Sequence, residues 1–310
     1  MRVSEDNIKG EILVEIKGLI TALVTPFDSQ DQLDIHATER LINRLIDNGV
    51  DGIFILGTNG EFHVMSTDEK IEFAKEVIRI VNHRVPVYVG TGGISTKETI
   101  DLSIKMQALG ADALSVITPY FMKLNDQELF KHFKAVAEAV EIPILLYNIP
   151  KMTGNPLSVE LVSQLAKIHN IKGVKDSSGD IENIKGYIEA TNDQDFAVVS
   201  GSDSLILPAL IAGATGAVAA TSNSITKIDK AIFNYYEEGN LDKAQEMQAS
   251  IEEFRRILKY ATVPSVLKYS LSLLGNPVGE ARRPVDQVPE EALKDIQTVM
   301  KQYKELEENL

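Results

Sequence analysis

Short apolar runs alternate with amphipathic segments over the first 240 residues of the chain. The runs are almost continuously apolar, which is typical of parallel strands buried on both faces. Eight runs predict strands: Leu19–Phe27, Gly52–Gly57, Pro86–Gly92, Ala113–Pro119, Pro143–Pro150, Ile171–Ser178, Phe196–Asp203 and Gly216–Thr221. The segments between them predict helices: His36–Asn48, Thr67–Val81, Thr96–Leu109, Gln127–Val140, Ser158–Ile168, Ile181–Thr191, Leu205–Ala212 and Ile225–Glu238.

This alternation predicts an α/β fold, a (β/α)8 TIM barrel over residues 19–239. A doubly wound sheet made of the same units is the structural alternative. After Gly239 the strand signals stop, and the pattern predicts only helices, over Leu241–Tyr260, Val263–Leu274 and Glu290–Glu308. No Gly/Ser linker precedes residues 240–310, so they are expected to form a C-terminal helical appendage packed on the barrel. Residues 1–18 are expected to form an N-terminal extension.

Charge and composition indicate which classes of partner and cofactor the protein is expected not to bind. The chain has 31 Lys and Arg against 45 Asp and Glu, a net charge of −14. An acidic surface repels phosphate backbones, so no nucleic acid and no membrane is expected as a partner. The absence of cysteine fits a reducing cytoplasm, and no run is long enough for a membrane span. No histidine pair, glycine-rich nucleotide motif or thiolate set is present, so we expect neither a metal nor an organic cofactor.

Lys175 is the most informative residue in the pattern, because it lies near the carboxyl end of the run Ile171–Ser178. Active residues of a (β/α)8 barrel lie at that end of the strands. Burial disfavours an ammonium group, and a neutral amine is a nucleophile that forms a Schiff base with a ketone. The alternative is a surface lysine at a strand end.

Two other strand ends carry candidate polar groups. Thr58 and Asn59 lie between Gly57 and Gly60, and such a turn can aim backbone N–H groups and a hydroxyl at a carboxylate. The alternative is a plain turn, in which Asn-Gly is common. Tyr147 ends its strand either as core packing or as a proton relay for a neighbouring amine.

The remaining strand ends offer room and apolar surface. Gly201 and Ser202 are small enough to leave space for a ligand, and Asp203 can bind hydroxyl groups or cap the following helix. Tyr120 and Phe121 form an aromatic pair that is expected to crowd the barrel mouth.

These motifs together resemble the dihydrodipicolinate synthase/N-acetylneuraminate lyase family, which are class I aldolases acting on pyruvate. The resemblance covers about Leu19 to Arg283. Five segments carry it, in order along the chain: Thr25-Pro26-Phe27, Gly57–Glu61, Tyr147-Asn148-Ile149-Pro150, Gly173–Asp176 and Gly201–Asp203.

The resemblance implies a role for each motif. Lys175 is then the Schiff-base lysine, Tyr147 the proton-shuttling phenol, and Thr58 with Asn59 the site of the pyruvate carboxylate. The backbone near Val218 lines the pyruvate pocket. The implied partners are a 2-keto acid such as pyruvate and an aldehyde, and the implied assembly is a homotetramer built from two dimers.

Three departures bear on the second substrate. Met152 stands where the synthase branch has an arginine, Phe121 where it has a second tyrosine, and Asn59 where it has a second threonine. We therefore expect an aldolase for 2-keto-3-deoxy sugar acids, with the aldehyde held near Met152, Phe121, Ser202 and Asp203. The alternatives are condensation of pyruvate with aspartate semialdehyde, a sugar-acid dehydratase, and a ligand-sensing barrel that has lost catalysis.

Overall fold

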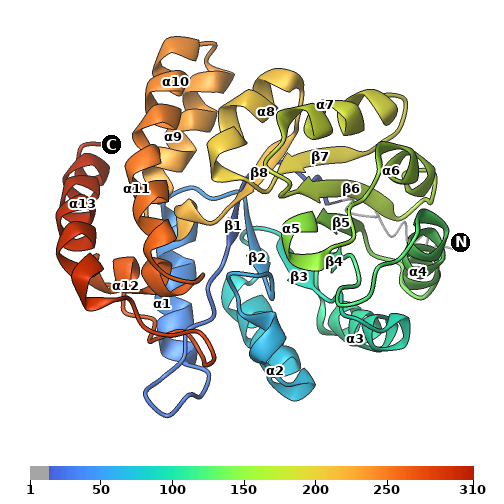
Figure 1. Ribbon diagram of the computed structural model, residues 1–310, viewed down its shortest axis with the longest axis horizontal. Helices are drawn as coiled ribbons and strands as arrows, with labels where there is room; N and C mark the ends of the chain where they lie inside the picture. The colour runs from blue at the N-terminus through green and yellow to red at the C-terminus, as the bar shows by residue number, and fades with distance from the viewer. Residues whose placement is uncertain (1–13) are drawn as a thin grey trace, which may run out of the picture.

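Eight parallel strands close into a barrel in the computed structural model, which describes residues 14–310 (Figure 1). Each strand pairs with the next along the chain, and β8 pairs with β1 to close the ring. The strands are β1 (Gly18–Ala22), β2 (Gly52–Ile55), β3 (Val87–Gly90), β4 (Ala113–Ile117), β5 (Ile144–Asn148), β6 (Ile171–Asp176), β7 (Ala197–Ser200) and β8 (Gly216–Ala219). The predicted (β/α)8 barrel is confirmed, and the doubly wound alternative is wrong.

Helices follow the strands as predicted: α1 (Ile35–Asp47), α2 (Thr67–Val81), α3 (Thr96–Leu109), α4 (Asp126–Glu138), α6 (Val159–Leu165), α7 (Ile181–Ala190), α8 (Ile206–Ala212) and α9 (Thr226–Glu237). The bounds of α2 and α3 match the prediction at both ends. Their first residues are marked by capping side chains, since Ser66 and Ser95 accept hydrogen bonds from backbone N–H groups of the first turn. The short helix α5 (Pro150–Thr153) was not predicted, because four residues are too few to show a helical period.

The C-terminal region consists of α10 (Leu241–Ser250), α11 (Glu252–Ile257), α12 (Ser265–Leu273) and α13 (Glu290–Glu308). The helix predicted over Leu241–Tyr260 is divided at Ile251 into two. Figure 1 shows these helices beside α9 and α1. Side chains join them to the barrel: Gln248 donates to the Asp203 carbonyl, and Glu307 accepts from Ile228 N–H. Within residues 14–310, no helix is long and apolar enough to cross a membrane.

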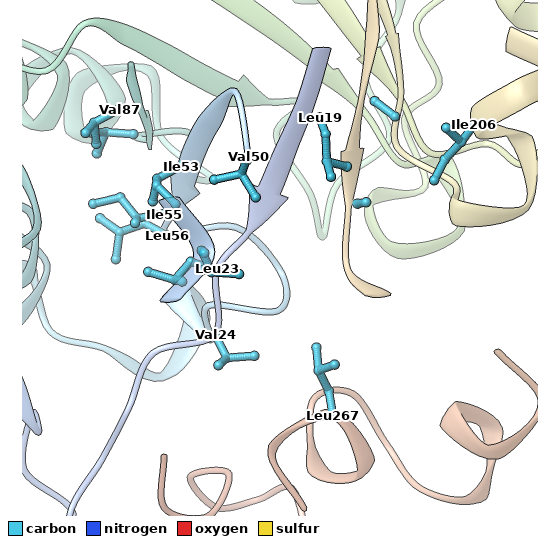
Figure 2. Packing of buried hydrophobic residues seen from close by; sticks show 14 of the residues in the cluster. Leu19, Leu23, Val24, Val50, Ile53, Ile55, Leu56, Val87, Ile206 and Leu267 are labelled. Carbon is cyan, nitrogen blue, oxygen red and sulfur yellow. The ribbon is translucent and has the colours of Figure 1, made fainter. Parts of the chain in front are cut away.

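Two apolar layers explain the continuous hydrophobic runs. Successive strand side chains alternate between them: Leu19 and Ile53 pack against the helices, whereas Ile20 and Phe54 point into the barrel. Figure 2 shows part of the outer layer, where β1 and β2 contribute residues to the same cluster as Leu267 of α12. The inner layer forms an apolar floor beneath the carboxyl ends of the strands. Of the N-terminal extension, residues 1–13 lie outside the described residues, and Gly18 already belongs to β1.

Candidate active site

Lys175 and Tyr147 are brought together by strand register. They are direct partners in the pairing of β5 with β6, and both side chains are buried, with 4% of each exposed. The Lys175 Nζ lies 4.0 Å from the centroid of the Tyr147 ring and 4.5 Å from that of Phe54. The two rings also meet edge to face, with centroids 6.2 Å apart. Two aromatic walls therefore hold the amine at the top of the barrel interior. The neutral amine expected from burial stays a prediction.

A hydroxyl chain leads from this pair toward the barrel mouth. The Tyr147 phenol oxygen lies 3.3 Å from Thr58 Oγ1, although β5 and the β2 loop are far apart in sequence. Thr58 and Asn59 are both partly exposed. Three of the predicted residues, Lys175, Tyr147 and Thr58, thus form one group in which an amine, a phenol and an alcohol are adjacent.

The turn predicted at Thr58 and Asn59 is present, but its glycines are not its left-handed residues. The positive φ angles belong to Leu56 (56°) and Glu61 (57°), which bracket the turn, and not to Gly57 or Gly60. Gly57 leaves space instead, because a Cβ there would lie 2.7 Å from the Phe54 ring. A Cβ on Gly60 would lie 3.2 Å from Leu56 N, so the turn is closely packed on the end of β2.

Gly201 allows β7 to pass close to the lysine. A Cβ at this position would lie 2.9 Å from Lys175 Cε, and the Gly201 N–H donates to the Asp176 carbonyl over 2.7 Å. Any larger residue would press on the Lys175 side chain. Val218 belongs to the apolar floor and is buried.

Asn148 and Asp176 fasten the lysine and tyrosine strands on the outer face. Each follows its reactive neighbour directly, and the Asn148 amide donates to the Asp176 carboxylate over 2.7 Å. Asn183 and Ser178 also donate to this carboxylate, while Leu157 N–H donates to Asn148 Oδ1. Burial raises the pKa of Asp176, against the opposing effect of these donors. Neither residue was predicted to have a role, although both stand in the motifs Tyr147-Asn148-Ile149-Pro150 and Gly173–Asp176.

The residues predicted for the second substrate do not form a comparable group. Met152 and Phe121 are 66% and 88% exposed. Phe121 does not crowd the mouth as predicted, because it projects into solvent, and only Tyr120 packs inward, edge to face on Phe62. The Asp203 carboxylate accepts from Ala220 N–H, and burial raises its pKa.

The backbone of Ser202 is hydrogen-bonded to a neighbouring side chain. The Ser200 hydroxyl donates to the Ser202 carbonyl and accepts from the Ser202 N–H. Across residues 14–310, no group of three or more His, Asp or Glu side chains is arranged to hold a metal ion.

The buried lysine and tyrosine side chains lie at the carboxyl ends of adjacent strands, where enzymes with a (β/α)8 barrel have their active sites. The comparison with family models agrees: residues 15–303 match the dihydrodipicolinate synthetase family, and the chain belongs to this family.

Curated relatives carry a more specific name. The chain is 35% identical over 285 residues to 4-hydroxy-tetrahydrodipicolinate synthase of Oceanobacillus iheyensis, covering 92% of this chain and 96% of that protein. It is 38% identical over 272 residues to 4-hydroxy-tetrahydrodipicolinate synthase 1 of Halalkalibacterium halodurans, covering 88% and 92%.

Solved structures give the same result. Dihydrodipicolinate synthase DapA-2 of Bacillus anthracis superposes with a TM-score of 0.91 at 36% identity, covering 93% of this chain and 99% of that one. YagE, a prophage protein of E. coli K12 in the same family that was crystallised with pyruvate, superposes with a TM-score of 0.90 at 33% identity, covering 93% and 99%.

One expectation from the sequence is corrected by these names. The chain was expected to stand closer to aldolases for 2-keto-3-deoxy sugar acids than to the synthases, and the named curated relatives are synthases. The expectation rested on three substitutions, at Met152, Phe121 and Asn59. Two of those side chains, Phe121 on the loop after β4 and Met152 on α5, are exposed, and relatives that differ at exposed positions can share an activity.

Proposed function

We propose that the protein forms a Schiff base between Lys175 and pyruvate and then makes or breaks a carbon–carbon bond at the pyruvate methyl carbon. The observation that carries this proposal is the grouping of three reactive side chains over an apolar floor. Lys175 Nζ lies 4.0 Å from the Tyr147 ring centroid, and the Tyr147 oxygen lies 3.3 Å from Thr58 Oγ1. An amine beside a phenol has both the nucleophile and the proton carrier that imine formation requires.

The chemistry follows from these groups. Neutral Lys175 attacks C2 of pyruvate, and Tyr147 delivers a proton to the carbinolamine hydroxyl, which leaves as water. The protonated imine accepts the electron pair when a C3 proton is lost, giving an enamine whose C3 attacks an aldehyde. In the reverse direction the same imine accepts the electrons of the breaking C3–C4 bond. In this proposal Thr58 and Asn59 bind the carboxylate, and the imine formed on Lys175 supplies the electron sink.

We propose aspartate semialdehyde as the aldehyde, because the curated relatives are named as synthases of 4-hydroxy-tetrahydrodipicolinate. A second candidate is cleavage of a 2-keto-3-deoxy sugar acid. It is favoured by Met152, whose exposed thioether offers no charge to a carboxylate, and by Phe121, which has no hydroxyl to pass a proton.

Borohydride trapping tests the covalent step. With pyruvate, the intact mass should rise by one reduced adduct, and peptide mapping should place it on Lys175. Lys175→Ala should abolish the adduct. Lys172→Ala is the matched control on the same strand, because Lys172 pairs with Asp195 at the surface. An adduct on another lysine, or none at all, contradicts the proposal.

Two activity assays on one preparation decide between the aldehydes. We expect kcat/KM for condensation of pyruvate with aspartate semialdehyde to exceed that for cleavage of any 2-keto-3-deoxy sugar acid. The opposite order supports the second candidate, and loss of water without C–C cleavage identifies a dehydratase instead.

The proposal extends to the oligomeric state of the protein and to the cell compartment in which it acts. Phe121 and Met122, on the loop after β4, and Met152, on α5 after β5, are exposed apolar residues, and Phe121 adopts a φ of 81°, which is uncommon outside glycine. Such a surface favours a partner subunit, and we propose a homotetramer built from two dimers, acting in the cytoplasm. Light scattering at micromolar concentration tests the assembly. One similar structure is described as a monomeric dihydrodipicolinate synthase variant, so a monomeric mass would place this chain with it.

A further inference from the structure

We propose that a buried ion pair between Glu61 and Lys268, together with Arg282, fixes the Gly57–Gly60 turn, and that the C-terminal region thereby sets the affinity for the 2-keto acid. Glu61, Lys268 and Arg282 are positioning residues in this proposal, because they act through Thr58 and Asn59. The inference rests on the proposed function, in which that turn binds the carboxylate of pyruvate.

The ion pair is deeply buried and joins two distant parts of the chain. Glu61 follows the turn directly, while Lys268 lies on α12, and each is 1% exposed. Lys268 Nζ forms an ion pair with Glu61 Oε1 at 2.6 Å, and it donates a hydrogen bond to the Glu280 carbonyl over 2.9 Å. The second carboxylate oxygen of Glu61 accepts from Arg282 N–H over 2.8 Å. A buried charge is tolerated only with such partners, so the position of Glu61 is tied to the C-terminal region.

The backbone at Glu61 needs an external restraint. Glu61 has a φ of 57°, a left-handed conformation that costs a non-glycine residue free energy and persists where surrounding contacts enforce it. Its N–H donates to the Thr58 carbonyl, and this hydrogen bond closes the turn between Thr58 and Glu61. The Thr25 hydroxyl donates to the Gly60 carbonyl over 2.7 Å. Glu61 therefore transmits any displacement of its carboxylate to Thr58 through a short, closed turn.

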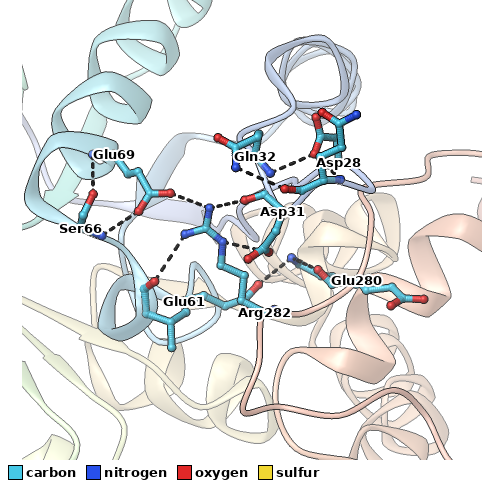
Figure 3. A network of polar contacts seen from close by, with 11 residues as sticks. Asp28, Asp31, Gln32, Glu61, Ser66, Glu69, Glu280 and Arg282 are labelled. Carbon is cyan, nitrogen blue, oxygen red and sulfur yellow. Dashed lines mark hydrogen bonds and ion pairs between the residues drawn. The ribbon is translucent and has the colours of Figure 1, made fainter.

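Arg282 ties the same region to the elements on either side of the turn. Figure 3 shows its guanidinium reaching Asp31 in the loop after β1 and Glu69 in the first turn of α2. The Arg282 guanidinium carbon also lies 3.9 Å from the centroid of the Phe27 ring. The hydrogen bond from Arg282 lowers the pKa of Glu69 to about 2. Arg282 thus joins the segment that follows β1 to the segment that follows β2, which contains the Gly57–Gly60 turn.

The other contacts of the C-terminal region reach elsewhere. Glu307 of α13 binds the first turn of α9, and Gln248 of α10 binds Asp203 and Leu207. Among the described residues, the Glu61 contacts thus link the C-terminal region with the carboxylate turn itself. A purely structural ion pair would change the free energy of unfolding alone, whereas a positioning role changes the binding of pyruvate.

Three variants and one control test the proposal. Glu61→Gln keeps an acceptor for Arg282 N–H and removes the charge, and burial already lowers the pKa of Lys268, so the fold should tolerate a neutral lysine. Glu61→Gln/Lys268→Met removes both charges, and Arg282→Lys removes the planar fork. Lys230→Met is the control, because Lys230 forms a 2.7 Å ion pair with Asp51, beside the amino-terminal ends of β1 and β2.

The measurement is the pyruvate concentration that gives half-maximal borohydride trapping on Lys175, with KM and kcat measured alongside. We expect this concentration to rise about tenfold in Glu61→Gln and in the double variant, below the roughly 100-fold loss that a displacement of about 1 Å causes. In these variants kcat at saturating pyruvate should change less than KM. Lys230→Met should lower the melting temperature without changing kcat, KM or the half-saturation of trapping.

The outcomes separate this inference from the proposed function. If the wild type is trapped and all three variants show its half-saturation, the positioning role is wrong while the Schiff base stands. If Lys230→Met raises the half-saturation equally, the effect is one of general stability, and the inference is also overturned. If the wild type itself is not trapped on Lys175, the proposed function fails first. Arg282→Lys carries the test if the buried substitutions prevent folding.

Discussion

The two halves of the barrel mouth are built by different means. The first, which we call the pyruvate half, consists of Lys175, Tyr147 and Thr58. Backbone register makes Lys175 and Tyr147 neighbours, and their side chains are buried over an apolar floor. The outer pair of Asn148 and Asp176 fastens the same two strands. Lys175 and Tyr147 are thereby fixed by the strands themselves, which is the most rigid support that a barrel offers, whereas Thr58 lies in the turn after β2.

The second, or aldehyde half, consists of Met152, Phe121, Ser202 and Asp203, which lie on the segments that follow β4, β5 and β7. Asn155 performs the anchoring here: its amide donates to the carbonyls of Pro119 and Met122, and its oxygen accepts from Leu124 N–H. The anchor fixes the loop backbone and leaves the side chains of Phe121 and Met152 in solvent. The difference predicts that substitutions at the strand ends alter the proposed imine chemistry, whereas substitutions in the segments after the strands alter the choice of the second substrate.

The largest expected effect is on proton transfer in the pyruvate half. Tyr147→Phe deletes one oxygen and keeps the ring against Lys175, so kcat should fall roughly 10²- to 10⁴-fold with little change in melting temperature. The matched control is Tyr88→Phe, because the Tyr88 hydroxyl is buried in the apolar floor without a hydrogen-bond partner. Retention of more than half of the activity by Tyr147→Phe would show that another group moves the proton.

The next effect concerns the charge that the aldehyde half lacks. If aspartate semialdehyde is bound by its carboxylate, Met152→Arg should raise kcat/KM for that substrate tens to hundreds of fold. A bidentate charge-assisted pair contributes about 2–4 kcal/mol. The measurement is steady-state kinetics of condensation with aspartate semialdehyde and of cleavage of a 2-keto-3-deoxy sugar acid. Met122→Arg is the control, since Met122 is exposed on the neighbouring loop. An unchanged Met152→Arg would mean that another residue, such as Lys151, already binds the carboxylate.

The positions of Lys175 and Tyr147 at the ends of their strands could be predicted from the sequence, for a physical reason. A strand of a parallel barrel is apolar on both faces, so a polar side chain at its carboxyl end stands out from the run. Lys175 and Tyr147 are found in this way, and strand pairing then brings them together without further information. Phe54 was not recognised, because an aromatic residue that shields the amine has the same pattern as one that fills the core.

The sequence could not predict how the loops are held. The flanking glycines indicated a tight turn, but they could not indicate that Leu56 and Glu61 adopt the left-handed φ angles or that Gly57 lies against the Phe54 ring. The partners of Glu61 lie more than 200 residues away in the chain, at Lys268 and Arg282. No local period encodes such a contact, and the neighbouring motif gives no sign of it.

A smaller effect separates the two anchors directly. Asn148→Ala removes the donor to Asp176 and leaves Leu157 N–H unpaired. We therefore expect kcat to fall about tenfold, both for condensation with aspartate semialdehyde and for cleavage of a sugar acid. Asn155→Ala is the matched variant, equally buried, and should instead raise KM for the aldehyde while leaving pyruvate trapping unchanged. Steady-state kinetics on both variants provide the measurement. Equal effects of the two variants on kcat would remove the distinction between the halves.

The smallest expected effect on activity lies outside both halves, at His132 on α4. Its Nδ1 is 2.9 Å from the Thr96 hydroxyl, its Nε2 has no hydrogen-bond partner, and burial lowers its pKa to about 4. The unfolded chain, with a pKa near 6.5, binds the proton more readily, so stability should fall as pH drops from about 6.5 to 4.

Urea unfolding at pH 7 and pH 4.5 measures this dependence. The wild type should lose about 2 kcal/mol more between these pH values than His132→Gln, and the exposed His169→Gln should behave as the wild type. The absolute stability of His132→Gln is not the test, because the substitution also changes the contact with Thr96. Because His132 touches neither half of the mouth, kcat of the folded protein should not depend on this substitution at either pH. A pH-dependent change in kcat in His132→Gln would connect α4 to the chemistry and would break the division into two halves argued above.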